Sequence, residues 1–109
     1  MDLAAILKAL GEPMRLTILR QLLERKHCVR SLSRKLGITE SAVSQHMKVL
    51  REAGLVYAEK YGRHTHYLPR QEALDMLAEE TEKMRTRSSL LNRERADCQC
   101  EFRRQEGKT

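Results

Sequence analysis

Hydrophobic positions between residues 31 and 55 recur at helical spacing and are interrupted by glycine. A first short run, Leu32 to Leu36, is followed by Gly37, a residue that adopts the left-handed backbone at a helix end without steric cost. The second run ends before Gly54, and its apolar residues share one helical face: Val43, Met47 and Leu50. The spacing predicts two helices joined by a tight turn.

The second of these helices carries a polar face with a distinct chemistry. Thr39 can cap its N-terminus, and Glu40 suits the positive end of the helix dipole. The face opposite the apolar one holds hydroxyls, an amide and cations: Ser41, Ser44, Gln45, Lys48 and Arg51. Such groups contact base edges and phosphates from a helix in the major groove. The pattern predicts a helix-turn-helix with a recognition helix from about Glu40 to Ala53, although an ordinary surface helix has a similar polar face.

Two more helices are predicted before this motif. Asp2 can cap a helix over Leu3 to Leu10, and Pro13 can open a second helix that ends near Arg25. The second helix is apolar over more than one face, so we expect it at the centre of the core. A short connector with room for one brief strand follows, and Cys28 falls at or just before the start of the third helix.

After the recognition helix the hydrophobic period changes to two. Residues 55–60 and 64–68 are β-prone, they flank the turn 61–63, and Pro69 ends the second run. Two such runs about a glycine-containing turn predict a β-hairpin. A hairpin in this place is a wing, and Arg63 at its tip can reach a DNA phosphate. Alternatively, the hairpin only closes the core.

A long helix is predicted from about Gln71 to Arg95, with an apolar stripe: Leu74, Leu77, Ala78, Thr81 and Met84. So small a domain cannot cover a helix of this length, whereas a second copy of the chain can do so in a two-fold dimer. The alternative is a helix that lies over its own core. We therefore expect a mainly α fold with a small β-hairpin, in which residues 1–95 form a winged helix-turn-helix with a long C-terminal dimerisation helix and residues 96–109 form a polar, cysteine-containing tail.

Composition narrows the class of protein. The 109 residues include 21 Lys and Arg against 15 Asp and Glu, and the net charge of +6 favours a partner that carries phosphates. The absence of Trp argues against a stacking platform for single strands. There is no apolar run of membrane-spanning length and no basic segment followed by an apolar run at the N-terminus. Three cysteines, an odd number, fit a reducing compartment, so we expect a cytoplasmic protein.

The order of these elements, with the segments LKALGEPMRLTILRQLLE, SLSRKLGITESAVSQHMKVLREAGLV and YGRHTHYLP, resembles the ArsR (arsenic-repressor) family of winged-helix transcriptional repressors. The resemblance covers about Leu7 to Pro69. It implies a homodimer that binds double-stranded DNA at a palindromic operator. It also implies release from DNA by an inducer, often a thiophilic metal or metalloid.

The resemblance assigns six DNA-contacting positions: Ser41, Ser44, Gln45, His46, Lys48 and Arg63. The chemistry agrees for Gln45, whose amide can pair with adenine through two hydrogen bonds. Lys48 matches a phosphate-contact position and Arg63 the wing tip. His46 can equally bond to a phosphate or to water.

The cysteines depart from the metal sites of the family. Members with a site on the third helix have Cys-Val-Cys at its start, whereas this chain has Cys28-Val29-Arg30. A second family site uses Asp and His on the last helix, which here contains no His. The remaining thiols are Cys28, Cys98 and Cys100. Three thiolates suit a soft, three-coordinate ion such as As(III), Sb(III) or Cd(II), and a helix N-terminus near Arg30 should lower the pKa of Cys28.

Other interpretations of the same residues stay open. Cys28 can be a small core residue and the tail pair can lack a role, or the thiols can sense oxidation. His64 and His66 share a strand face and can bind zinc, although no carboxylate or Cys neighbours them in sequence.

A winged helix that binds protein and an enzyme that uses the cysteines are further alternatives. The basic balance and the polar face of the recognition helix favour DNA over protein. There is no Gly-rich phosphate loop and no acid/base pair to support catalysis, so we expect no enzyme and no required cofactor.

Overall fold

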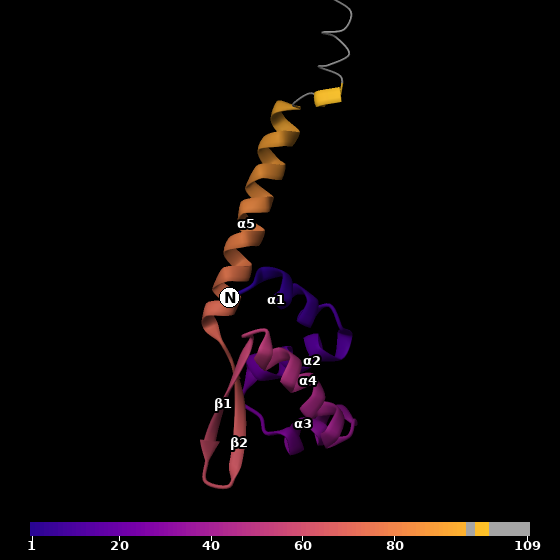
Figure 1. Ribbon diagram of the computed structural model, residues 1–109, viewed down its shortest axis with the longest axis vertical. Helices are drawn as coiled ribbons and strands as arrows, with labels where there is room; N and C mark the ends of the chain where they lie inside the picture. The colour runs from indigo at the N-terminus through magenta and orange to yellow at the C-terminus, as the bar shows by residue number, and fades with distance from the viewer. Residues whose placement is uncertain (96–97, 101–109) are drawn as a thin grey trace, which may run out of the picture. The chain divides into compact units, whose positions relative to one another are not determined.

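The computed structural model describes residues 1–95 and 98–100. Its elements are, in order, α1 (Leu3–Leu10), α2 (Pro13–Glu24), α3 (Val29–Leu36), α4 (Glu40–Glu52), β1 (Val56–Tyr61), β2 (His64–Pro69) and α5 (Gln71–Glu94) (Figure 1). The predicted mainly α fold with one small hairpin and a long last helix is confirmed. The chain divides after Leu77 into two compact units. Most of the predicted tail, 96–97 and 101–109, lies outside the described residues.

Local capping fixes where the helices begin and end. Asp2 accepts a hydrogen bond from the N–H of Ala4 at 3.0 Å, and Pro13 opens α2. The third helix begins at Val29 with Cys28 as its N-cap, which confirms the prediction that Cys28 falls at or just before its start. Gly37 ends it in the left-handed conformation, at φ 69°.

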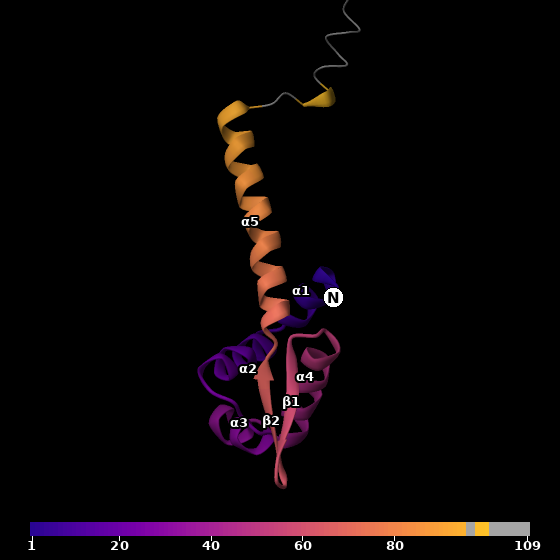
Figure 2. The same ribbon diagram turned by 90° about the vertical axis from the view of Figure 1, so that its left-hand side faces the viewer.

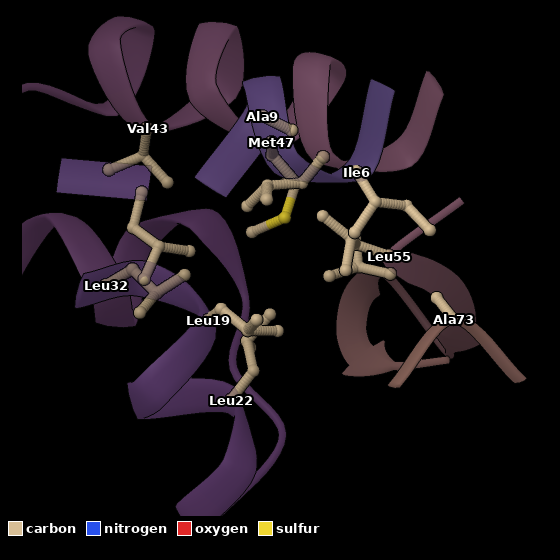
Figure 3. Close-up of a cluster of buried hydrophobic side chains, with 12 residues drawn as sticks. Ile6, Ala9, Leu19, Leu22, Leu32, Val43, Met47, Leu55 and Ala73 are labelled. Atoms are coloured by element: carbon tan, nitrogen blue, oxygen red, sulfur yellow. The ribbon is translucent and has the colours of Figure 1, made fainter. Parts of the chain in front are cut away.

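The core of the first unit is formed by side chains from all helices and from the first strand (Figure 3). Its buried hydrophobic residues are Ile6, Ala9, Ile18, Leu19, Leu22, Leu32, Val43, Met47, Leu50, Leu55, Val56 and Ala73. The helix α2 packs against α1, α4 and β2, in agreement with its predicted central place. The second apolar face of α2 is not buried in this core, since Leu23 on that face is 54% exposed.

The two strands form an antiparallel hairpin whose register runs from Val56 opposite Pro69 to Tyr61 opposite His64. Gly62, at φ 63°, occupies the turn in a conformation that glycine adopts readily. The connector before α3 adds one further bridge to β2. The Tyr67 N–H donates to the carbonyl of His27 at 2.8 Å, and the His27 N–H donates back at 3.4 Å. The predicted brief strand is thus a single bridge that joins the start of α3 to the hairpin.

None of the helices in the described part of the chain combines the length and the apolar composition that a membrane span requires.

Candidate nucleic-acid interface

The turn between α3 and α4 is closed by side-chain hydrogen bonds. The Ser33 hydroxyl donates to the carbonyl of Ile38 at 2.6 Å, and the Thr39 hydroxyl accepts from the N–H of Ala42 at 3.0 Å. The predicted cap at Thr39 is therefore confirmed. These bonds hold α4 in one orientation on α3, and a fixed orientation is what a helix needs to present the same side chains to a groove.

The helix α4 divides sharply into a buried and an exposed face. Val43, Met47 and Leu50 are at most 1% exposed, as the spacing predicted. The opposite face exposes four of the predicted DNA-contacting residues: Ser41, Ser44, Gln45 and Lys48. Within residues 1–95 and 98–100 these four side chains form no hydrogen bond or ion pair. Their donors and acceptors are therefore available to an external partner.

His46 lies differently from the other predicted contacts. Its side chain is only 24% exposed, and its Nδ1 is 3.7 Å from the carboxylate of Glu12 at the start of α2. A hydrogen bond from the Arg15 N–H is the main cause of a lowered pKa at Glu12, and the charge of His46 contributes. His46 thus connects the recognition helix to α2. A DNA contact by His46 stays a prediction, and sequence alone gave no sign of this pairing.

The wing presents a cation at its tip and an aromatic cluster beside it. Arg63 is exposed in the turn, as predicted. Next to it the Tyr61 hydroxyl donates to the Glu59 carboxylate at 3.1 Å, and the Lys26 ammonium lies 3.8 Å from the centroid of the Tyr61 ring. These contacts stiffen the tip and join it to the connector before α3.

The two strand histidines stack on each other, with ring centroids 6.4 Å apart. The hairpin register places Glu59 opposite His66, a neighbour that linear sequence did not reveal. Nevertheless, the described residues contain no group of three His, Cys, Asp or Glu side chains that could hold a metal ion. The interpretation of His64 and His66 as polar wing residues is the simpler one.

Cys28 occupies the N-cap of α3, where its Sγ accepts a hydrogen bond from the Ser31 N–H at 3.4 Å. Burial raises the pKa of this thiol, but hydrogen bonding by Ser31 and by the backbone of Arg30 outweighs burial, so the net pKa is lowered. The predicted direction is confirmed. As expected at a helix N-terminus, backbone N–H groups at the start of α3 lower the pKa, and the Ser31 side chain adds to their effect. Cys28 borders a 550 Å³ depression together with Arg30, Ser31, Arg34 and Lys35.

The other two predicted ligands lie close to each other. The Sγ atoms of Cys98 and Cys100 are 2.9 Å apart, both residues are exposed, and none of the three described cysteines forms a disulfide. Cys28 belongs to the first unit and the pair to the second. A single site that uses all three thiols stays a prediction.

Comparison with known proteins relates residues 12–58 to the family model "Bacterial regulatory protein, arsR family". The chain is 42% identical over 62 residues to the HTH-type transcriptional repressor SmtB of Mycobacterium tuberculosis, a match over 57% of this chain that spans about half (46%) of that protein's length. It is 37% identical to the arsenical resistance operon repressor of Bacillus subtilis, over 67% of this chain and 71% of that protein.

Among solved structures, an ArsR-like transcriptional regulator from Rhodococcus sp. RHA1 superimposes with a TM-score of 0.71 and 26% identity, over 83% of this chain and 90% of the other. These relatives are transcriptional regulators and not enzymes, in agreement with the expectation of a DNA-binding regulator.

Proposed function

Because the chain belongs to the arsR family of bacterial regulatory proteins, we propose that it is a transcriptional repressor that binds its operator as a homodimer. We further propose that a thiophilic ion, As(III), Sb(III) or Cd(II), releases it from DNA. The observation that carries the DNA-binding part is the divided recognition helix: a fully buried apolar face against exposed hydroxyl, amide and ammonium groups that bond to nothing else in the described residues.

In this proposal α4 enters the major groove. Gln45 pairs with a base edge, Ser41 and Ser44 bond to bases or backbone, and Lys48 neutralises a phosphate. Arg63 extends the contact from the wing. A two-fold dimer presents two such helices, so the operator should be palindromic, with half-sites about one helical turn apart or a multiple of it.

The exposed stripe of α5 supports the dimer. Met84 and Leu91 are 58% and 50% exposed, and they follow Leu77 at intervals of seven residues. Heptad spacing places the three on one face of a helix, which is the arrangement of a helix that packs along a second helix. A second copy of α5 in an isologous contact would cover these side chains.

The properties of the thiols support a thiophilic ion as the inducer. The lowered pKa of Cys28 raises the fraction of thiolate, which is the form that binds soft ions. The 2.9 Å separation of Cys98 and Cys100 lets both sulfurs approach one ion. The similarity to a repressor of arsenical resistance favours a metalloid. The same close sulfur pair favours an oxidant as the second candidate inducer.

Release can begin at the cap of α3. An ion on the Cys28 sulfur competes with the Ser31 N–H for it, and α3 packs directly against the recognition helix. A shift of α3 would change the orientation of α4, so that the two recognition helices of a dimer no longer match their half-sites.

The test is a titration of the reduced protein on an operator selected from a pool of random duplexes. Arsenite, antimonite and cadmium are added to the wild type and to a variant with Ser at positions 28, 98 and 100. We expect one ion to release the wild type and to leave the variant bound.

Single substitutions then assign the ligands. Full response in Cys28→Ser would exclude release through the cap of α3. If neither protein responds to any of the three ions, the thiol–metalloid proposal is wrong, and peroxide is the next effector to titrate.

A further inference from the structure

The recognition helix and the wing run side by side (Figure 2), and residues of both line a groove. Its volume is about 610 Å³, and it is lined by Ser44, Met47, Lys48, Arg51, Glu52 and Tyr67. All but Tyr67 belong to α4, and Tyr67 lies on β2. We call this feature the α4–wing groove.

The groove is a place of net positive charge. Ser44, Lys48 and Arg51 follow one another at intervals of four and three residues and therefore line one edge of the helix. Lys48 and Arg51 carry two positive charges against the single carboxylate of Glu52. In the described part of the chain none of these three charged groups forms an ion pair. Two cations without a counter-ion are suited to hold an anion.

Arg51 has a defined position because of Tyr67. Its guanidinium carbon is 6.0 Å from the centroid of the Tyr67 ring, within reach of a cation–π contact. The ring is itself held: Tyr67 packs on the hydrophobic core, pairs with Ala58 across the hairpin and forms the bridge to His27. A planar guanidinium beside a fixed ring keeps its donors directed and loses little freedom when it binds an anion.

The geometry of a DNA duplex indicates which anion would lie in the groove, namely a backbone phosphate. The major and minor grooves of B-DNA are separated by one phosphodiester chain. The wing lies beside α4, so with α4 in the major groove and the wing tip directed to the adjacent minor groove, that chain passes between α4 and the wing. This argument rests on the DNA binding proposed above.

We propose that the α4–wing groove holds a phosphodiester of this chain. Lys48 and Arg51 neutralise it, the Ser44 hydroxyl donates to it, and Tyr67 is the positioning residue for Arg51. Arg51 lies on the polar face of α4 that was predicted to contact bases and phosphates, and the groove gives it a specific phosphate to bind. Tyr67 is the residue that this proposal adds to the DNA interface. The contribution of Arg51 and Tyr67 is to affinity for any duplex, because a phosphate carries no sequence information.

The first experiment measures affinity for a random-sequence duplex as a function of salt. Arg51→Gln should make the fall of log affinity with log salt less steep, by up to about 0.9 for each protomer, because one neutralised phosphate contributes that much and Lys48 still faces the same group. Arg20→Gln removes the same charge from an exposed position on α2, outside the groove, and should leave the slope unchanged. An unchanged slope for Arg51→Gln, or an equal loss for both variants, would overturn the proposal.

The second experiment separates Tyr67 from a purely structural role. Tyr67→Leu should weaken binding in the wild type and have no further effect in the Arg51→Gln background, while it keeps its full effect in the Arg63→Gln background. Equal losses in all three backgrounds would overturn the positioning role.

Because Tyr67 also packs on the core, a third measurement leaves that side chain intact. Methylphosphonate is placed at single positions of the selected operator, and at one position in each half-site it should abolish the difference between wild type and Arg51→Gln. If no position does so, the phosphate site is overturned. Failure of the wild type to bind any duplex at low salt would instead reject the DNA-binding function itself.

Discussion

The two units of the chain differ in how far their apolar residues are buried. Up to Leu77 the helices and the first strand bury a shared core, in which residues such as Leu50 and Leu55 have no exposed surface. From Ala78 to Arg95 every residue is at least partly exposed, including Met84 and Leu91. The first unit therefore carries its own hydrophobic stabilisation, whereas the apolar residues of the second are available for a partner.

The largest effect should come from the core of the first unit. Leu50→Ala removes a fully buried side chain and should lower the free energy of unfolding by about 2–5 kcal/mol. Leu91→Ala is the matched control, since it makes the same change at a residue that is 50% exposed. In urea denaturation of dilute protein the control should cost no more than about 0.5 kcal/mol. Comparable losses for the two variants would show that the two units do not differ in the way described.

Charged substitutions at Met84 and Leu91, two exposed apolar residues of α5, should reduce dimer formation rather than the stability of the folded chain. Met84→Asp combined with Leu91→Asp would place two carboxylates in the proposed contact between copies, so sedimentation should show a monomer for this variant and a dimer for the wild type. Thr86→Asp adds a carboxylate to another face of the same helix and should leave the dimer intact. Operator affinity should fall with the dimer, because two linked half-site contacts become single ones. A dimer that persists in the double variant would assign the contact to other residues.

The smallest predicted effect is a loss of stability at low pH, and it is confined to the first unit. Burial lowers the pKa of His27 below its ordinary value of 6.5, and the charges of Lys35 and Arg25 lower it further. The unfolded chain therefore takes up the proton first, so the stability contributed by neutral His27 is present above pH 6.5 and is lost as the pH falls through the lowered folded pKa.

Hydrogen exchange at decreasing pH measures this loss. Amides of α3 and β2 should lose protection in acid, while those of α5 beyond Leu77 should not. His27→Asn keeps a polar group near Ser31 without titrating in this range, and it should flatten the dependence above pH 4.5, the ordinary pKa of Glu12. A dependence that persists unchanged in this variant would assign the titration to another group.

Sequence reasoning predicted the elements of the first unit well because helical periodicity, glycine stops and caps are local. The buried face of α4 and the cap at Thr39 follow from residues within one or two turns of each other. Contacts between distant segments could not be predicted in this way. The pairing of His46 with Glu12, the position of Arg51 beside Tyr67 and the bridge between His27 and Tyr67 all depend on how elements pack.

The candidate site was predictable to the same extent. The exposed face of the recognition helix is a property of one helix and was identified from spacing. The lowered pKa of Cys28 was predicted from its place at a helix N-terminus, whereas the contribution of the Ser31 side chain depends on the exact position of the N-cap. Whether three thiols share an ion depends on an arrangement between units that no local pattern encodes.

The bridge between His27 and Tyr67 fixes the length of the connector between α2 and α3. Each residue of the connector has a structural role, since Arg25 ends α2, Lys26 lies over the Tyr61 ring, His27 pairs with the wing and Cys28 caps α3. One inserted residue would either break the bridge or turn α3 by about 100° about its axis. The turn at the wing tip takes no part in this bridge, so an insertion there leaves the bridge intact. Variation in loop length should therefore accumulate at the tip, while the connector stays constant in length even where its residues change.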